Sequence, residues 1–247
     1  MDTRIFAHRG ASGYAPENTL EAFRLAVEQG ADGVELDVHL TRDGHIIVTH
    51  DERIDRCSDG SGLVGRLTLK EIKKHSFSKP HPEYEGALAP TLEEVLELLQ
   101  PTGMWVNVEL KNGVIPYPGM EEKCVRLVEK MGMADRVLYS SFNHHSLLLL
   151  KRIKPDAPCG LLYGCNMLFP ADYLKKTGVE ALHPHYWDLL LHPEGYAEAK
   201  RQGGRVHVWT VNDDRDVRKC ADAGADILIT NYPDRALAAL GRGASAR

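Results

Sequence analysis

The segment Gly33-Val34-Glu35-Leu36-Asp37-Val38 places two carboxylates inside an otherwise apolar run. Because the side chains of a β-strand alternate between its faces, Glu35 and Asp37 point one way while their apolar neighbours point the other. Two carboxylates on one face of a core strand cost free energy unless a cation lies between them. A divalent metal ion is the simplest such cation. A hairpin arm that faces solvent would also accommodate the pair, so this segment alone leaves both interpretations open.

Two further apolar segments end in polar residues. Residues 4–7 (Arg-Ile-Phe-Ala) run into His8 and Arg9, and residues 46–49 (Ile-Ile-Val-Thr) run into His50. Histidine changes its protonation state near neutral pH, and arginine pairs with two phosphate oxygens at once. Each residue alone has a structural explanation, such as a histidine satisfied in the core. Together with the carboxylates they indicate phosphate chemistry at a metal centre.

Strand-like apolar runs alternate with amphipathic, helix-like segments along nearly the whole chain. The expected strands cover residues 4–8, 33–38, 104–110, 136–142, 159–163, 181–185, 205–211 and 226–230. The expected helices cover residues 18–29, 91–99, 120–131, 143–153, 170–176, 194–202, 213–223 and 233–240. Eight such pairs predict an α/β fold of the (β/α)8 TIM type. A doubly wound open sheet is the alternative, but the chain has no G-x-G-x-x-G fingerprint opening a helix.

One segment interrupts this alternation. The turn signal Thr41-Arg42-Asp43-Gly44 predicts a hairpin over residues 35–49, which would return His50 to the level of Glu35. Residues 51–90 then form a small insertion after the second strand and its hairpin. This insertion is rich in Gly, Ser, His and Pro, and its middle carries one weak helix.

The composition excludes several classes of function. A net charge of -5 gives no basic patch by composition, so a nucleic-acid partner is not expected. We find no run of about 18 apolar residues and no basic-then-apolar leader, so we expect neither a membrane span nor a signal peptide. The five cysteines are scattered without metal-ligand spacing, which is typical of reduced thiols in the cytoplasm. We predict a cytoplasmic monomer or homodimer with one domain over residues 1–247 and a frayed tail from residue 241.

Polar residues recur where later strands end. Glu109 and Lys111 again share one strand face, and Trp209-Thr210-Val211-Asn212 closes the seventh expected strand. Catalytic groups of a TIM-type barrel lie at the carboxyl ends of its strands. Taken alone, Glu109 and Lys111 are better explained as a buried ion pair. The recurrence at one end of many strands favours a catalytic site instead.

These motifs, in this order, resemble the glycerophosphodiester phosphodiesterases, and the resemblance extends from His8 to about Pro233. The motifs that carry it are His8-Arg9-Gly10, Pro16-Glu17-Asn18-Thr19, Glu35-x-Asp37, Thr41-x-Asp43-Gly44, His50-Asp51, Glu109-x-Lys111, Ser140-Ser141-Phe142 and Trp209-Thr210-Val211-Asn212. The chain departs from the family at Asn231, where aspartate is common. As a set the motifs are highly specific.

The resemblance implies a divalent metal ion held by Glu35, Asp37 and Glu109. It also implies that His8 and His50 form the acid/base pair and that the insertion covers the pocket as a small cap. Three carboxylate ligands suit a hard cation, which would be Mg²⁺ or Ca²⁺, with Mn²⁺ as a further option.

The substrate side of the site follows from side-chain chemistry. Arg9 can bind phosphate oxygens as a fork, and Lys111 can supply a point charge beside the metal ligands. Phe142, Trp209 and Tyr186 are candidates for the walls around the glycerol or alcohol moiety.

The expected reaction is metal-dependent hydrolysis of a small-molecule glycerophosphodiester to glycerol 3-phosphate and an alcohol. The attacking oxygen is either the glycerol 2-hydroxyl, which gives a cyclic phosphate, or a water molecule. Lysophospholipids or other lipid diesters are alternative substrates, without stable insertion of the protein into a membrane. A non-catalytic barrel that binds glycerol phosphates is a further alternative, but it would be expected to lack a histidine or a carboxylate of the set.

Overall fold

The computed structural model describes residues 3–243 and forms a closed barrel of eight parallel strands. The barrel strands are β1 (Arg4–His8), β2 (Gly33–Leu40), β4 (Trp105–Leu110), β5 (Val137–Ser141), β6 (Cys159–Tyr163), β7 (Ala181–Pro184), β8 (Arg205–Val208) and β9 (Ile227–Thr230). The ring closes because β1 pairs in parallel with both β9 and β2. The predicted TIM-type barrel is therefore confirmed.

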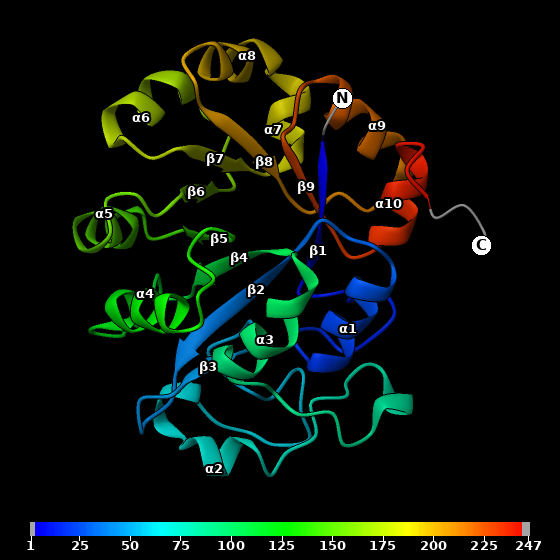
Figure 1. Ribbon diagram of the computed structural model, residues 1–247, viewed down its shortest axis with the longest axis vertical. Coiled ribbons are helices and arrows are strands. Elements are labelled where there is room, and N and C mark those ends of the chain that lie inside the picture. Colours follow the sequence, from blue (N-terminus) through cyan, green and yellow to red (C-terminus); the bar gives the residue numbers. More distant parts are fainter. Residues whose placement is uncertain (1–2, 244–247) are drawn as a thin grey trace.

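Helices surround the ring of strands on its outer side (Figure 1). They are α1 (Leu20–Glu28), α3 (Leu92–Leu99), α4 (Met120–Lys130), α5 (His144–Ile153), α6 (Pro170–Thr177), α7 (Tyr186–Leu191), α8 (Pro193–Arg201), α9 (Asp214–Asp222) and α10 (Pro233–Ala239). All expected helices are present, with ends that differ by a few residues. The short α7 was not predicted, because six residues are too few to show a helical period.

Local sequence signals explain where several helices begin and end. Thr91 and Glu94 form a reciprocal capping box at the start of α3. Gly178 ends α6 in the left-handed conformation, with φ of 67°. Asn143 occupies the N-cap position of α5, but its side chain donates to the Asn112 carbonyl and accepts no hydrogen bond from the helix.

The predicted hairpin is present and positions the insertion. Strand β3 (Ile46–Val48) runs antiparallel to β2, with Val48 opposite Val38, and it lies outside the closed ring. The segment that follows contains α2 (Leu69–Ile72) and lies beside β3 in Figure 1. It has a small apolar cluster of its own, which includes Ile54, Val64, Ile72 and Phe77. That barrel and insertion form one folding unit stays a prediction.

Strand alternation divides apolar from polar residues as expected. Val34, Leu36 and Val38 belong to the large apolar cluster formed with the helices. Glu35 and Asp37 are buried as well, but on the opposite face of β2, where both lie next to Glu109 of β4. The solvent-facing alternative for these two carboxylates is thereby excluded.

Two sequence predictions concerning chain segments are corrected. Strand β8 ends at Val208 rather than at residue 211: beyond it Trp209 keeps only an isolated parallel bridge to His185, and Trp209 and Thr210 line a pocket. The tail is not frayed from residue 241, since Arg242 donates to both carboxylate oxygens of Asp32, at 2.9 and 2.7 Å. Residues 244–247 lie outside the described part of the chain. Among the described helices, none has the length and apolar character that crossing a bilayer requires.

Candidate active site

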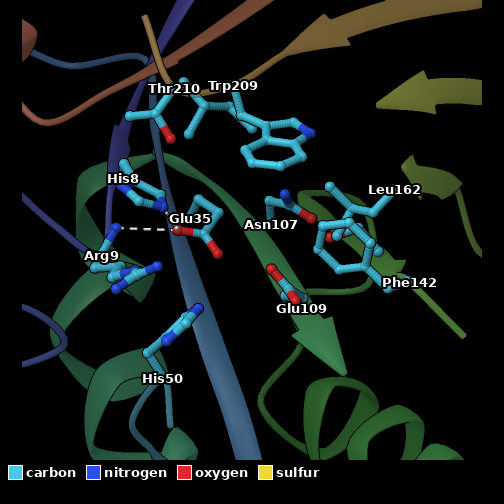
Figure 2. Close-up of a pocket in the computed structure, with 12 residues that line it drawn as sticks. His8, Arg9, Glu35, His50, Asn107, Glu109, Phe142, Leu162, Trp209 and Thr210 are labelled. Atoms are coloured by element: carbon cyan, nitrogen blue, oxygen red, sulfur yellow. Dashed lines mark hydrogen bonds and ion pairs between the residues drawn. The ribbon is translucent and has the colours of Figure 1, made fainter. Parts of the chain in front are cut away.

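A pocket opens at the carboxyl ends of the barrel strands. Its lining residues are His8, Arg9, Glu35, His50, Asn107, Glu109, Ser140, Phe142, Leu162, Trp209, Thr210 and Ile229. Figure 2 shows the charged side chains on one side and Phe142 and Leu162 on the other. Apart from Tyr186, the structure thus brings together all predicted site residues as lining groups except Asp37 and Lys111. Those two lie against the lining, because Lys111 donates to Glu109 and forms an ion pair with Asp37.

Strand register places the carboxylates next to one another. The β1–β2 register sets His8 beside Glu35, and the β2–β4 register sets Asp37 beside Glu109. Residues two positions apart on a strand share a face, so the interior faces of three adjacent strands contribute this cluster. The alternation of side chains along these strands therefore explains why the carboxylates and His8 lie together.

Glu35, Asp37 and Glu109 have the arrangement of a cation site. One oxygen from each carboxylate lies within 4.8 Å of the others, and all three side chains are buried. Burial and the neighbouring carboxylates raise the pKa of Glu35 well above its ordinary value. Burial and Asp37 likewise raise the pKa of Glu109 to about 7. Oxygen ligands that repel one another in this way fit a hard divalent cation.

Asp37 remains ionised within this cluster. Burial opposes its charge, but Arg9 and Lys111 hold the pKa of this carboxyl well below its usual range. Asn18 Nδ2 donates to Asp37 Oδ2 at 2.9 Å, whereas the other oxygen, Oδ1, has no hydrogen bond among the described residues. A buried carboxylate oxygen without a hydrogen bond is a further feature that fits a metal ligand.

The loop after β1, which brings Arg9 and Asn18 to these carboxylates, has a strained backbone at both residues. Arg9 and Asn18 both have positive φ angles, of 57° and 58°. The Arg9 backbone N–H donates to Glu35 Oε2 at 3.0 Å, and Arg9 Nη1 donates to Glu17 Oε1 at 2.9 Å. Such conformations are disfavoured for residues other than glycine and are found mainly at functional sites.

His8 faces the carboxylate cluster. Its Nδ1 donates to Asn231 Oδ1 at 2.7 Å, and its Nε2 lies 3.9 Å from Glu35 Oε2. Burial, followed by the positive charge of Arg9, lowers the pKa of His8 to about 4. The imidazole is therefore neutral at physiological pH, with Nε2 as the nitrogen available to the pocket. Asn231 stands where aspartate is common in the family, and its Oδ1 accepts the hydrogen bond that orients the His8 ring.

His50 lies on the other side of the cluster. Its Nδ1 donates to Asp51 Oδ1 at 2.6 Å, and its Nε2 accepts from Lys111 Nζ at 3.1 Å. His39 helps to fix the backbone of His50, since its Nε2 donates to the His50 carbonyl at 3.1 Å. The hairpin thus returns His50 to the pocket, as the turn signal predicted.

Apolar rings line the opposite wall. The rings of Phe142 and Trp209 meet edge to face, with centroids 5.6 Å apart. Tyr186 does not line the pocket, which corrects its prediction as a wall residue. Its ring lies behind Trp209, against His185.

Two polar groups inside the barrel, Asn107 and Ser140, were not predicted as site residues, although Ser140 belongs to one of the motifs that carry the family resemblance. Asn107 Oδ1 and Ser140 Oγ are buried in the pocket lining and have no hydrogen bond to any described residue. Asn107 shares the interior face of β4 with Glu109, two positions away, and this spacing could have revealed it. Both groups are free to bind a ligand or a water molecule.

Comparison with known proteins identifies the family. Residues 8–235 match the glycerophosphoryl diester phosphodiesterase family. The glycerophosphodiester phosphodiesterase of Caldanaerobacter subterraneus subsp. tengcongensis is 42% identical over 235 residues, which cover 95% of this chain and 96% of the relative. That of Bacillus altitudinis is 39% identical, with 95% and 97% covered.

Solved structures give the same result. A phosphodiesterase from Oleispira antarctica in complex with the product sn-glycerol-3-phosphate has a TM-score of 0.88 and 32% identity, with 96% of each chain covered. A glycerophosphodiester phosphodiesterase from Agrobacterium tumefaciens has a TM-score of 0.84 and 29% identity, covering 96% of this chain and 99% of its own. The family match spans nearly all the described residues, including the whole pocket. The chain therefore belongs to the glycerophosphoryl diester phosphodiesterase family.

Proposed function

We propose that this pocket hydrolyses glycerophosphodiesters to glycerol 3-phosphate and an alcohol. The observation that carries the proposal is the position of two histidines, His8 and His50, on either side of a buried cluster of three carboxylates. A diester phosphate beside such a cluster would have a proton acceptor and a proton donor within reach. The product found in the Oleispira antarctica relative supports glycerol 3-phosphate as the product here.

Glu35, Asp37 and Glu109 would hold the divalent cation, with Mg²⁺ or Ca²⁺ preferred and Mn²⁺ as an option. When bound, the cation would neutralise charge on the non-bridging phosphate oxygens and orient the diester. The raised pKa values of Glu35 and Glu109 support this assignment, since these carboxylates gain most from a neighbouring positive charge.

His8 and His50 divide the proton transfers between them. One imidazole accepts a proton at Nε2 from the attacking oxygen, and the other, in the imidazolium form that carries protons on both nitrogens, donates its Nε2 proton to the departing alcohol oxygen. Asn231 and Asp51 accept hydrogen bonds from the two Nδ1 atoms, so both histidines present Nε2 to the pocket. This shared orientation supports a role for both rings without deciding which of them is the base.

Arg9 and Lys111 are proposed to bind phosphate. Both side chains are mostly buried, and each is already held by carboxylates, so little conformational freedom is lost when a phosphate binds. Phe142 and Trp209 are proposed to pack against the glycerol or alcohol moiety, because their rings form the wall opposite the charged groups.

The experiment that tests this proposal is ³¹P NMR of glycerophosphocholine turnover by wild type, His8→Ala and His50→Ala. We expect either substitution to reduce turnover at least about 100-fold, with the fold unchanged by circular dichroism. His145→Ala is the matched control, because His145 is exposed on α5 and does not line the pocket. A wild-type rate in either histidine variant would refute the acid/base assignment. A transient cyclic glycerol phosphate signal would show attack by the 2-hydroxyl, and its absence during direct formation of glycerol 3-phosphate would favour water.

A lysophospholipid is a second candidate substrate, and a specific observation favours it. The segments that follow β5, β6 and β7, including α7, expose large apolar side chains after the carboxyl ends of these strands, which is the end of the barrel where the pocket opens. These residues, which we call the apolar rim, are Phe142, Leu168, Phe169, Trp187 and Leu191. Leu168 and Phe169 are 84% and 68% exposed. Exposed apolar groups next to a charged pocket fit a substrate that carries both a phosphate and an acyl chain.

Two assays separate the candidates. If lysophospholipids are substrates, a Leu168→Ser/Phe169→Ser variant should lose activity on lysophosphatidylcholine and keep its activity on glycerophosphocholine. Equal rates of the variant and wild type on lysophosphatidylcholine would refute a role for the rim. Cosedimentation with phosphatidylcholine vesicles then tests whether the rim binds a bilayer instead of single lipid molecules.

A further inference from the structure

Arg56, in the insertion, binds two carboxylates that lie in separate loops. Its Nη1 and Nη2 each donate to one oxygen of Glu17 at 2.8 Å. Its Nε and Nη2 donate to the two oxygens of Asp51 at 2.7 and 3.1 Å. Glu17 precedes α1 and Asp51 follows β3, so one guanidinium joins the β1 loop, the hairpin and the insertion. Charge-assisted forks of this kind fix geometry as well as adding energy.

Each of these carboxylates also holds a residue of the pocket. Asp51 accepts from His50 Nδ1 at 2.6 Å, and Glu17 accepts from Arg9 Nη1 at 2.9 Å. Burial opposes their ionisation, but hydrogen bonds from Arg56 and from their other partners lower the pKa of both carboxyls to about 2. Both are therefore charged at neutral pH, and each is shared between Arg56 and one residue of the pocket.

We propose that Arg56 is a positioning residue for the phosphodiesterase reaction, since it fixes Asp51 behind His50 and Glu17 behind Arg9. This inference rests on the proposed function of the pocket. Asp51, held by two hydrogen bonds from Arg56, keeps the proton on His50 Nδ1 and leaves Nε2 facing the pocket. Glu17 binds both Arg56 and Arg9. Its negative charge is therefore shared between two guanidinium groups, and it fixes the position of Arg9 without neutralising Arg9 completely.

The position requires a guanidinium rather than a positive charge alone. Three nitrogens of Arg56 make four hydrogen bonds to two carboxylates, and a lysine ammonium cannot span both in this geometry. Arg56→Lys is therefore expected to behave more like Arg56→Ala than like wild type.

Two observations argue against a role for Arg56 in the stability of the insertion alone. The insertion has its own apolar cluster around Ile54, Cys57 and Phe77, so it does not depend on Arg56 for packing. The Arg56 side chain is 49% exposed, so about half of its surface is already in contact with solvent. Arg53 is the matched control, because it lies in the same insertion, is 54% exposed and, among residues 3–243, forms its ion pair with Asp55 alone.

The first test compares kinetics on glycerophosphocholine. We expect Arg56→Ala to reduce kcat roughly 10- to 100-fold, Arg56→Lys to recover little of this, and Arg53→Ala to stay within about twofold of wild type. Millimolar guanidinium chloride should restore part of the kcat of Arg56→Ala and leave Arg53→Ala unchanged. Because Arg56 acts through both Asp51 and Glu17, adding Arg56→Ala to a variant that carries Asp51→Asn and Glu17→Gln together should cost little more.

The second test does not depend on turnover, so it separates this inference from the proposed function. The imidazole ¹⁵N shifts of His50, assigned by comparison with His50→Ala, should report a proton fixed on Nδ1 in wild type and in Arg53→Ala. In Arg56→Ala they should move toward a mixture of tautomers. Unchanged His50 shifts, a kcat within about twofold of wild type, or losses that multiply with those of the Asp51→Asn/Glu17→Gln variant would each overturn the inference. If wild type turns over no diester while the His50 shifts still respond to Arg56, the proposed function fails and the positioning role stands.

Discussion

Replacing Glu109 by glutamine should stabilise the metal-free protein even though it abolishes turnover. The carboxylates of Glu35, Asp37 and Glu109 form one buried cluster with two cations, Arg9 and Lys111. Without a bound metal ion, the five side chains would carry one excess negative charge in a buried site. Glutamine has nearly the shape of glutamate and removes this charge.

The magnitude follows from the pKa of Glu109, which burial and Asp37 raise from 4.5 to about 7. One pKa unit corresponds to about 1.4 kcal/mol, so keeping this carboxylate ionised in the folded protein costs about 3 kcal/mol above pH 7. Between pH 4.5 and 7 the folded protein binds more protons at Glu109 than the unfolded chain does. The free energy of unfolding therefore falls as pH rises through this window, and glutamine removes that fall.

The assay is urea unfolding of EDTA-treated protein at pH 5 and pH 8. We expect the wild type to lose about 3 kcal/mol more than Glu109→Gln between these two pH values. The control is Glu121→Gln, because Glu121 is also buried but is satisfied by Ser146 Oγ at 2.6 Å and Asn112 Nδ2 at 3.0 Å. This control should be destabilised at both pH values, since it loses charge-assisted hydrogen bonds.

The result that refutes this reasoning is a Glu109→Gln variant less stable than the wild type at pH 8 without metal. An equal change between pH 5 and pH 8 in both proteins would refute it as well. Added Ca²⁺ or Mg²⁺ should raise the unfolding midpoint of the wild type and raise that of the variant much less, because ligand binding to the folded state stabilises it.

Three further predictions concern other parts of the chain. Glu35→Ala should abolish activity together with any response of the unfolding midpoint to added metal, and a preserved response would contradict its assignment as a ligand. Burial lowers the pKa of His207 to about 3, so this residue by itself contributes a loss of folded stability as pH falls below about 6.5. His207→Gln should remove that contribution, which is up to about 1.4 kcal/mol per pH unit in urea unfolding. Thr91→Ala should cost about 1 kcal/mol by removing the cap of α3, whereas Thr102→Ala, outside that capping box, should cost less.

Much of the site could be predicted from the sequence because strand periodicity fixes which side chains share a face. Glu35 with Asp37, and Glu109 with Lys111, are each two positions apart, and the structure places each pair together. The hairpin that returns His50 was predictable because Thr41 to Gly44 form a turn signal, and Gly44 has the expected positive φ of 81°.

Partners that come from different loops could not be predicted. The contacts of Arg56 with Glu17 and Asp51 depend on how the insertion folds onto the barrel, and no periodic pattern encodes that. The apolar rim was missed for a related reason. Leu168 and Phe169 look like core residues in sequence, and only the path of their loop shows that they are exposed.

The most direct test of the central claim is release of glycerol 3-phosphate from glycerophosphocholine and glycerophosphoethanolamine by EDTA-treated protein, before and after addition of Mg²⁺, Mn²⁺ or Ca²⁺. The proposed site predicts turnover that returns with metal in the wild type and stays absent in His8→Ala. No release from either diester with any of the metals, by protein shown to be folded, would contradict it.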